Sequence, residues 1–331
     1  MVGYDPTSDV HLSESEQAAA GAISGVITRA IAQPLDVVKV RFQLQIEPIK
    51  KGGGSTYHGV TQAFIKILRE EKMQALWKGH VPAQMLSISF GLVTFSSFEI
   101  LTKDIGKLFP IVLTDRYQPA YHFTCGGLAG CIATVVSQPM DVVRTRLVAQ
   151  GEPKIYPTIY SAVKTMYKQE GARCFFRGLS PTLLQIVPQS GLMFGFYSFF
   201  VNIWEKYIKT EHHHTHHPTG IESMVCGSLS GVFSKSIVYP LDLMKKRLQV
   251  VGFDEARKKF GQVRNYKSLR DCTMTIFREE GIKGLFKGIV PSVMKAALSV
   301  GITFCSYEQV CEFMETHWHD NKSTSLTKNK S

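Results

Sequence analysis

The chain has 331 residues, and its 38 Lys and Arg outnumber its 27 Asp and Glu, which gives a formal net charge of +11. This composition excludes a collagen-like chain, a disulfide scaffold and a disordered polypeptide. The charges are spread unevenly, because three stretches of 20, 24 and 27 residues (79–98, 117–140 and 178–204) contain no Lys, Arg, Asp or Glu. A helix that crosses a bilayer needs about 20 apolar residues, so the sequence indicates a membrane protein.

The first 17 residues form a polar segment with four Asp or Glu and no Lys or Arg. Signal peptides begin with basic residues and transit peptides contain few acids, so we expect that this segment is not a cleaved leader. The seven cysteines form no C-x-x-C pair, and most lie in apolar stretches. This pattern favours buried free thiols over a disulfide or a metal site.

An eight-residue motif recurs three times, about 100 residues apart: PLDVVKVR at 34–41, PMDVVRTR at 139–146 and PLDLMKKR at 240–247. Each copy is followed by an aromatic–basic–glycine triplet, at 77–79, 176–178 and 286–288. Self-similarity at a fixed period is typical of a repeat architecture. We therefore predict three repeats, at 18–117, 118–217 and 218–316, with a polar tail at 317–331.

Each repeat predicts the same helices in the same order. In the first repeat, a long helix over 16–45 is followed by a basic loop. A short amphipathic helix over 60–71 comes next, with Ala63, Ile67 and Leu68 on its apolar face, and a second long helix covers 80–103. The corresponding long helices are expected at 118–150, 179–208, 221–251 and 289–316. Pairs of glycines four residues apart, such as Gly21 and Gly25, are expected to let neighbouring helices approach closely.

The loops within the repeats are basic, whereas those between repeats are mixed in charge. The positive-inside rule then places the loops within repeats in the more interior compartment and both termini on the other side. Because the basic residues flank apolar stretches and form no single stripe, nucleic acid is not expected as a partner. The run His212–His217 lies between repeats beside a proline, which favours a solvated loop over a metal site.

Six charged residues lie near the C-terminal ends of the first long helices: Asp36, Lys39, Asp141, Arg144, Asp242 and Lys245. A charge that faces lipid costs about 3 kcal/mol, so these residues are expected to point inward. An acid and a base three residues apart can pair within one helix. Alternatively, helix kinks at the motif prolines bring the three charged ends together into an interhelical ring. We favour the ring, because a pair within a helix does not require threefold repetition.

The motif Px[DE]xx[KR]x[KR], followed by [DE]Gxxxx[WYF][KR]G, is present three times between Ala18 and Glu315 and resembles the signature of the mitochondrial carrier family. One departure is Lys72, because the family has glycine there, as at Gly171 and Gly281. The resemblance implies an all-α inner-membrane protein, with six transmembrane helices in a threefold pseudo-symmetric barrel and three short amphipathic helices on the matrix side. It also implies a monomer that exchanges substrates by alternating access.

The resemblance implies a matrix gate in which the acid of one repeat pairs with the base of the next: Asp36 with Arg144, Asp141 with Lys245, and Asp242 with Lys39. A glutamine that braces these pairs is present as Gln43 and Gln249, and Val148 replaces it in the second repeat. The gate at the opposite end is expected to be weak, because the family pattern [YF][DE]xx[KR] is incomplete in all three repeats.

The substrate site implied by the resemblance is found by counting from the motifs. Its positions lie seven and eight residues past each triplet glycine and five residues before each motif proline: Leu86, Ser87, Gln185, Ile186, Lys295, Ala296, Arg29, Thr134 and Lys235. The three cations are expected to be unpaired and to bind an anionic substrate. Lysines that merely snorkel are not expected in the middle of a span.

Two local strings, at 77–84 and 252–257, resemble carriers of thiamine pyrophosphate within this family. A pyrophosphate group suits the three cations. Gln185 and Ser87 are expected to bond the aminopyrimidine, and Phe90 to face the thiazolium ring. Thiamine pyrophosphate is thus expected as the transported substrate and not as a bound cofactor, with nucleotides as the counter-substrate.

Two other functions stay open: a carrier of adenine nucleotides or coenzyme A, and a membrane scaffold or proton leak without a substrate. Buried cations disfavour the scaffold. An enzyme and a metal site are not expected, because no nucleophile–base set or metal-ligand cluster falls at the axis.

The resemblance further implies sites for cardiolipin, a lipid with two phosphates, at the triplet glycines Gly79, Gly178 and Gly288, where helix N-termini attract phosphate. Gly59 is the partner glycine of the first site. Because Thr158 and Ser268 take its place in the other repeats, the three sites are expected to differ in affinity.

Overall fold

The computed structural model describes residues 14–47, 49, 56–108, 118–207, 220–254 and 263–314. Each repeat begins with a long helix that contains the motif proline: α1 (Glu14–Leu44), α4 (Gln118–Ala149) and α7 (Gly220–Gln249). Each repeat ends with a second long helix: α3 (His80–Leu108), α6 (Leu179–Tyr207) and α10 (Ile289–Met314).

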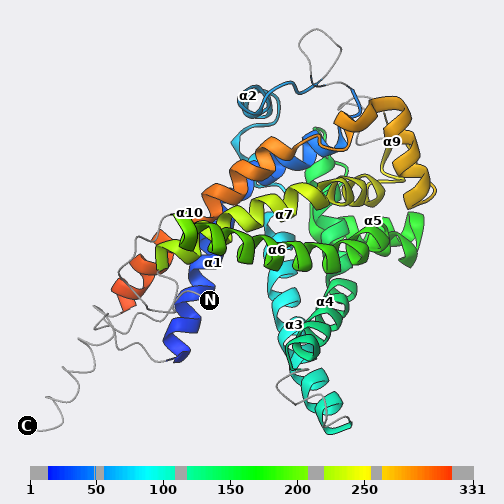
Figure 1. Ribbon diagram of the computed structural model, residues 1–331. Coiled ribbons are helices and arrows are strands. Elements are labelled where there is room, and N and C mark those ends of the chain that lie inside the picture. Colours follow the sequence, from blue (N-terminus) through cyan, green and yellow to red (C-terminus); the bar gives the residue numbers. More distant parts are fainter. Residues whose placement is uncertain are drawn as a thin grey trace, which may run out of the picture.

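Between the two long helices of each repeat lies a short helix: α2 (Val60–Glu71), α5 (Ile159–Glu170) or α9 (Leu269–Gly284). Short 3-10 turns, η1 (Met73–Trp77) and η3 (Ala172–Phe176), follow the first two. In the third repeat the corresponding kink lies inside α9, at Gly281. The described residues contain no strand, and the predicted all-α fold with three repeats is confirmed (Figure 1).

Four of the six long helices are long and apolar enough to cross a membrane, namely α3, α4, α6 and α10. The other two, α1 and α7, contain more charged residues, among them Arg29, Asp36 and Lys39 in α1. These charges line an interior cavity, described below, and so do not face lipid. The reduced hydropathy of α1 and α7 therefore reflects an inward-facing polar surface.

The long helices pack in three pairs, each made from the second helix of one repeat and the first helix of the next. α3 packs along α4, α6 along α7, and α10 returns to pack along α1, which closes the ring (Figure 1). The first helices α1, α4 and α7 also contact one another. The molecule is thus a threefold arrangement of helix pairs joined through their first helices.

The hydrophobic core lies at one end of the ring, which we call the closed end. It consists of the C-terminal halves of α1, α4 and α7 together with the short helices and the 3-10 turns. Val37, Val142 and Leu243 are fully buried there, and Ile67 of α2 and Ile276 of α9 pack onto the same end. The middle parts of α3 and α6 contain no buried residue. Tight packing therefore holds one end of the barrel together.

The triplet glycines allow the second helices to begin against the neighbouring repeat. Gly79, Gly178 and Gly288 all have a positive φ, between 76° and 84°. A Cβ atom at Gly178 would lie 2.9 Å from the Lys245 carbonyl oxygen, and one at Gly288 would lie 3.1 Å from that of Lys39. Only glycine tolerates both the backbone conformation and this close approach.

Two local expectations are wrong in detail. Ala63 and Ile67 of α2 are buried, but Leu68 is 41% exposed, because it lies about 100° around the helix from Ile67 and so at the edge of the buried stripe. A Cβ atom placed at Gly21 or Gly25 would meet no neighbouring atom within 4 Å, so the helix backbones do not approach closely at that pair.

The repeat boundaries at 117/118 and 217/218 stay predictions, because residues 109–117 and 208–219 lie outside the described residues. The histidine run His212–His217 and the tail 317–331 lie outside them as well, and so do residues 1–13 of the N-terminal segment.

Candidate substrate cavity and gate

Three interhelical ion pairs join α1, α4 and α7 at the closed end, and we call them the ion-pair ring. Arg144 Nη2 lies 2.8 Å from Asp36 Oδ2, Lys245 Nζ lies 2.8 Å from Asp141 Oδ2, and Lys39 Nζ lies 2.6 Å from Asp242 Oδ2. These are the partners that the family resemblance implied. Along the described parts of α1, α4 and α7, no ion pair joins an acid to the base three residues later in the same helix.

Two glutamines lie directly beneath the ring. Gln249 Nε2 donates to Asp141 Oδ2 at 2.8 Å, and Gln43 Nε2 donates to Asp242 Oδ2 at 3.3 Å. Val148, at the same position in the second repeat, is buried and provides no such hydrogen bond to Asp36. The glutamines therefore support two of the three pairs.

Lys246 is a further cation at the ring that sequence reasoning missed. Its Nζ lies 3.0 Å from Asp141 Oδ1, from Thr145 Oγ1 and from Gln249 Oε1, so that all three of its protons have acceptors. Lys246 occupies the variable position of the motif, where the other repeats have Val40 and Thr145. The charged residue at that position, present in one repeat only, was the signal available in the sequence.

A cavity of about 510 Å³ lies above the ring, and the six ring residues line its floor. Its walls contain nine of the ten expected substrate contacts: Arg29, Leu86, Ser87, Phe90, Thr134, Gln185, Ile186, Lys235 and Lys295. Ala296, the tenth, follows Lys295 on α10 but does not line the cavity. Seven Lys or Arg and only three Asp line it, which makes the cavity strongly electropositive.

The expectation of three unpaired cations is wrong for Lys295. Its Nζ lies 2.7 Å from Asp36 Oδ1 and 2.6 Å from Asp36 Oδ2. Arg29 donates to the Ala83 carbonyl oxygen at 3.0 Å and so has a neutral partner. Lys235 has no ion-pair partner among the described residues. Lys295 has an acidic partner, unlike Arg29 and Lys235, because α10 packs along α1 and brings Lys295 over Asp36.

Three glutamate clusters at the closed end were also missed. In each, a glutamate at the end of the short helix pairs with the last arginine of the motif and with the basic residue of the triplet: Arg41–Glu71–Lys78, Arg146–Glu170–Arg177 and Arg247–Glu280–Lys287. All nine residues belong to motifs that recur in register. That recurrence was the available signal, but nothing in it says which charges meet.

Each glutamate cluster also binds the backbone at the C-terminal end of the first long helix of the next repeat. Lys78 Nζ donates to the Gln150 carbonyl oxygen at 3.3 Å, and Arg146 Nη2 donates to that of Val251 at 2.9 Å. Arg247 Nε donates to the Gln43 carbonyl oxygen at 3.0 Å. The clusters therefore satisfy a carbonyl group in the last turn of α1 and carbonyl groups of residues just beyond α4 and α7, where the helical hydrogen-bond pattern ends.

In the first two clusters the positive charges lower the pKa of the glutamate. Burial alone would raise the pKa of Glu71, but the hydrogen bonds and charges of Arg41 and Lys78 outweigh it and lower that pKa. Burial would likewise raise the pKa of Glu170, but the hydrogen bonds and charges of Arg146 and Arg177 outweigh it, so this pKa is lowered as well. Both glutamates are therefore held in the ionised form.

The residue before each motif proline forms another threefold contact. Gln33 Nε2 donates to the Lys78 carbonyl oxygen at 3.0 Å, and Gln138 Nε2 donates to that of Arg177 at 2.9 Å. In the third repeat, the Tyr239 hydroxyl donates to the Lys287 carbonyl oxygen at 2.8 Å. The change from glutamine to tyrosine hides this contact in the sequence.

An ion pair within one helix lies at the opposite end of the barrel. It joins Lys103 and Glu99 at 2.6 Å, lies within α3, and both side chains are more than 60% exposed. The three ion pairs of the ring, by contrast, join different helices and lie at the closed end.

The expected lipid-binding glycines lie at the starts of helices at the closed end, and two of them, Gly178 and Gly288, are buried. Gly59 precedes α2 and has an extended backbone with no side-chain cap, whereas Thr158 and Ser268 cap α5 and α9 through their hydroxyl groups. The triplet glycines open the second helices, with the close packing described above.

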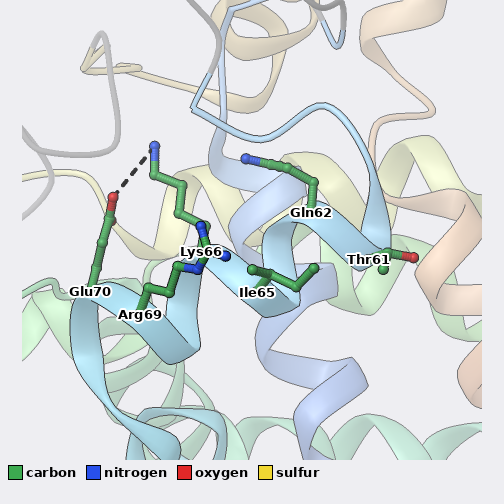
Figure 2. A pocket seen from close by; sticks show the side chains of 6 residues that line it. All are labelled: Thr61, Gln62, Ile65, Lys66, Arg69 and Glu70. Atoms are coloured by element: carbon green, nitrogen blue, oxygen red, sulfur yellow. Dashed lines mark ion pairs between the residues drawn. The ribbon is translucent and has the colours of Figure 1, made fainter.

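A second cavity, of about 540 Å³, lies on the outer face of α2 (Figure 2). Thr61, Gln62, Ile65, Lys66, Arg69 and Glu70 line it, and all six residues belong to that one helix. Its single ion pair, Lys66–Glu70 at 3.8 Å, is partly exposed. The described residues contain no group of three or more His, Cys, Asp or Glu that could hold a metal ion.

A ring of helix pairs with a cationic cavity, closed at one end by interhelical ion pairs, has the architecture of a membrane transporter. The family model described as mitochondrial carrier protein matches residues 11–107, 115–207 and 216–318. The chain therefore belongs to the mitochondrial carrier family, whose members are multi-pass transporters.

Similar proteins cover nearly the whole chain. The mitochondrial thiamine pyrophosphate carrier of Bos taurus is 49% identical over 315 residues, which cover 95% of this chain and 97% of that protein. The protein of the same name from Homo sapiens is also 49% identical, with 94% and 96% covered. The mitochondrial thiamine diphosphate carrier 1 of Arabidopsis thaliana is 35% identical, with 91% and 94% covered.

Proposed function

We propose that this protein exchanges thiamine pyrophosphate across the mitochondrial inner membrane, and that it is a transporter and not an enzyme. The observation that carries the proposal is the 49% identity, over 95% of the chain, to a relative named for that substrate. The cationic cavity supports it, because Lys and Arg form strong charge-assisted hydrogen bonds with phosphate groups. Thiamine pyrophosphate is then cargo and not a resident cofactor.

The cavity residues divide between the two ends of this substrate. Arg29, Lys235 and Lys295 are the partners for the pyrophosphate. Gln185 and Ser87 line the wall where an aminopyrimidine finds hydrogen-bond partners, and the ring of Phe90 is 40% exposed for contact with a thiazolium cation. Leu86, Thr134 and Ile186 complete the wall. The proposal does not rest on Ala296.

The ion-pair ring is the matrix gate in this proposal, with Gln43 and Gln249 as its braces. The closed end then faces the matrix, and both termini face the intermembrane space. The positive-inside rule supports this orientation, because basic residues of the short helices, among them Lys66, Lys164 and Arg270, lie at the closed end. The protein, acting as a monomer, then rests open to the cytosolic side.

Transport is tested with the full chain in liposomes. We expect uptake of labelled thiamine pyrophosphate when the vesicles contain nucleotides, and little uptake of thiamine, which lacks the phosphates. Lys235→Gln is expected to weaken pyrophosphate binding about tenfold, because it removes one charged partner. Equal uptake of thiamine and thiamine pyrophosphate would contradict the proposed substrate.

Cardiolipin binding at Gly59, Gly79, Gly178 and Gly288 is the second part of the proposal. The free N–H groups of helix N-termini attract phosphate, and at α2 no side chain occupies them. We expect cardiolipin to raise the melting temperature more than a neutral lipid does, and Gly59→Ser to reduce that gain. An equal effect of both lipids would contradict this part.

A further inference from the structure

The charged residues of the cavity are distributed unevenly over its walls. The Lys and Arg side chains that line it come from α1, α4, α7 and α10. The lining residues of α3 and α6 are all uncharged. In the proposed function, the cationic walls are thus the place for the pyrophosphate, and the walls made by α3 and α6 are left for the two rings of the substrate.

Gln185 and Gln189 form a hydrogen-bonded pair of amides on the α6 wall. Gln185 Nε2 donates to Gln189 Oε1 at 3.0 Å, and both side chains are partly buried and line the cavity. Residues four apart lie on the same face of a helix. The same two positions, counted from the triplet glycine, hold no amide in the other repeats: Leu86 and Phe90 on α3, and Lys295 and Ser299 on α10. The amide pair is therefore particular to the second repeat.

The hydrogen bond between the two amides determines which polar groups they offer to a substrate. Gln185 directs an N–H of its Nε2 at Gln189, so its Oε1 stays available as an acceptor. Gln189 uses its Oε1, so its Nε2 stays available as a donor. A glutamine without such a partner can turn its amide by half a turn, which exchanges the two groups. The pair therefore offers one acceptor together with one donor.

We propose that Gln189 is a specificity-determining residue, because it holds the Gln185 amide in the orientation that recognises the amino group of the aminopyrimidine. This amino group donates a hydrogen bond, and the ring nitrogen beside it accepts one. The two groups complement Gln185 Oε1 and Gln189 Nε2. Recognition of this edge rests on the proposed function, in which the cargo is thiamine pyrophosphate.

Oxythiamine pyrophosphate is the analogue with the opposite pattern. It has an oxo group in place of the amino group, and the ring nitrogen beside the oxo group carries a proton. An acceptor of the site then faces an acceptor of the ligand, and a donor faces a donor. A site built to hydrogen-bond a substrate discriminates strongly against a ligand that leaves its polar groups unpaired. Because the pyrophosphate is the same in both compounds, the ratio of their affinities reports on the ring alone.

The experiment uses the two compounds as competitors of labelled thiamine pyrophosphate, in liposomes that contain the full chain. We expect the unmodified chain to bind thiamine pyrophosphate about tenfold more tightly than oxythiamine pyrophosphate, as the loss of two hydrogen bonds of ordinary strength predicts. Gln189→Leu should bring this ratio close to one, because the Gln185 amide can then turn and donate to the oxo group.

Gln189→Glu separates the orientation of Gln185 from packing of the α6 wall. A carboxylate only accepts hydrogen bonds, so it still holds Gln185 Nε2 and leaves Oε1 for the amino group. The added negative charge weakens binding of both compounds, but their ratio should stay several-fold above that of Gln189→Leu. Ser299→Ala, at the same position of α10 and outside the residues that line the cavity, is the control and should keep the full ratio.

The outcomes distinguish this proposal from the proposed function. Uptake of thiamine pyrophosphate by a chain that binds both compounds equally would overturn the role of the amide pair and leave the transport proposal standing. An undiminished ratio in Gln189→Leu, or equal ratios in Gln189→Leu and Gln189→Glu, would likewise show that Gln189 does not orient Gln185. If the unmodified chain takes up no thiamine pyrophosphate, the proposed function is wrong, and recognition of its aminopyrimidine is rejected with it.

Discussion

At the scale of single residues, Lys72 occupies a backbone conformation suited to glycine. Its φ is 68° and its ψ is 169°, close to the values of Gly171 and Gly281 at the same position of the other repeats. A residue with a side chain is strained there by about 1–3 kcal/mol. The side chain is exposed, so that it offers little packing in return.

We expect Lys72→Gly to raise the free energy of unfolding by about 1 kcal/mol, because relief of the strain outweighs the greater freedom of glycine in the unfolded chain. Thermal unfolding in detergent measures the gain. Lys72→Ala is the control, since alanine keeps the strain and removes only the charge. A gain of the same size in Lys72→Ala would show that the lysine charge, and not the backbone, is responsible.

At the scale of elements, the glutamate clusters attach each short helix to two repeats. Glu170 pairs with Arg146 of α4 and with Arg177, and both arginines donate to the Val251 carbonyl oxygen beyond α7. Removing one member of a buried ion-pair cluster leaves the others without compensation and costs about 3–5 kcal/mol. The short helices therefore hold the closed end through these clusters as well as through apolar packing.

We expect Glu170→Gln to lower the free energy of unfolding by about 3 kcal/mol at neutral pH. The pKa of Glu170 is lowered in the folded protein. Its contribution is therefore fully present above the ordinary value of 4.5 and is lost as the pH falls through the folded pKa. Melting temperatures of the parent and the variant should converge below pH 4.5. Glu205→Gln, an exposed glutamate of α6, serves as the control, and a gap that persists in acid would contradict the ionic origin.

At the scale of the whole molecule, the closure depends on ion pairs that join the three repeats. A pair of unit charges 4 Å apart attracts by about 4 kcal/mol at an effective dielectric constant of 20, and desolvation offsets much of this. The Lys39–Asp242 pair is the cleanest one to test, because each of the other two acids has a second cation.

A cysteine introduced at Gly91, which lines the cavity and has room for a side chain, reports how far the closed end admits a membrane-impermeant thiol reagent. We expect Lys39→Asp to increase labelling of this cysteine from the closed end, because two carboxylates then face each other. Adding Asp242→Lys should restore part of the closure, since the charges are exchanged across the same interface. Exchanging Lys103 and Glu99, which pair within α3 at the other end, should have no effect. If the double variant is labelled as strongly as the single one, Lys39 and Asp242 do not act together.

Much of the fold followed from the sequence because its signals are local and repeated. The expected span of α2, 60–71, agrees with the structure, and the first long helices agree within two residues. The C-terminal end of a helix is harder to predict where no proline interrupts the sequence. The helix α3, for example, continues to Leu108 instead of ending at 103. The positions of the cavity residues followed from the family resemblance by counting from motifs that recur in register, and nine of the ten line the cavity.

The sequence by itself determined the three repeats, the order of their helices and, through the family resemblance, the partners in the ion-pair ring, because each signal is a short motif that recurs in register. Only the tertiary structure decided which charges meet outside that pattern. Lys295 and Asp36 are 259 residues apart, and Lys246 and Asp141 are 105 apart. An amino-acid pattern specifies the face on which a charge lies, but the partner depends on how α10 returns to α1 and how α7 packs against α4. That packing is a property of the closed ring as a whole.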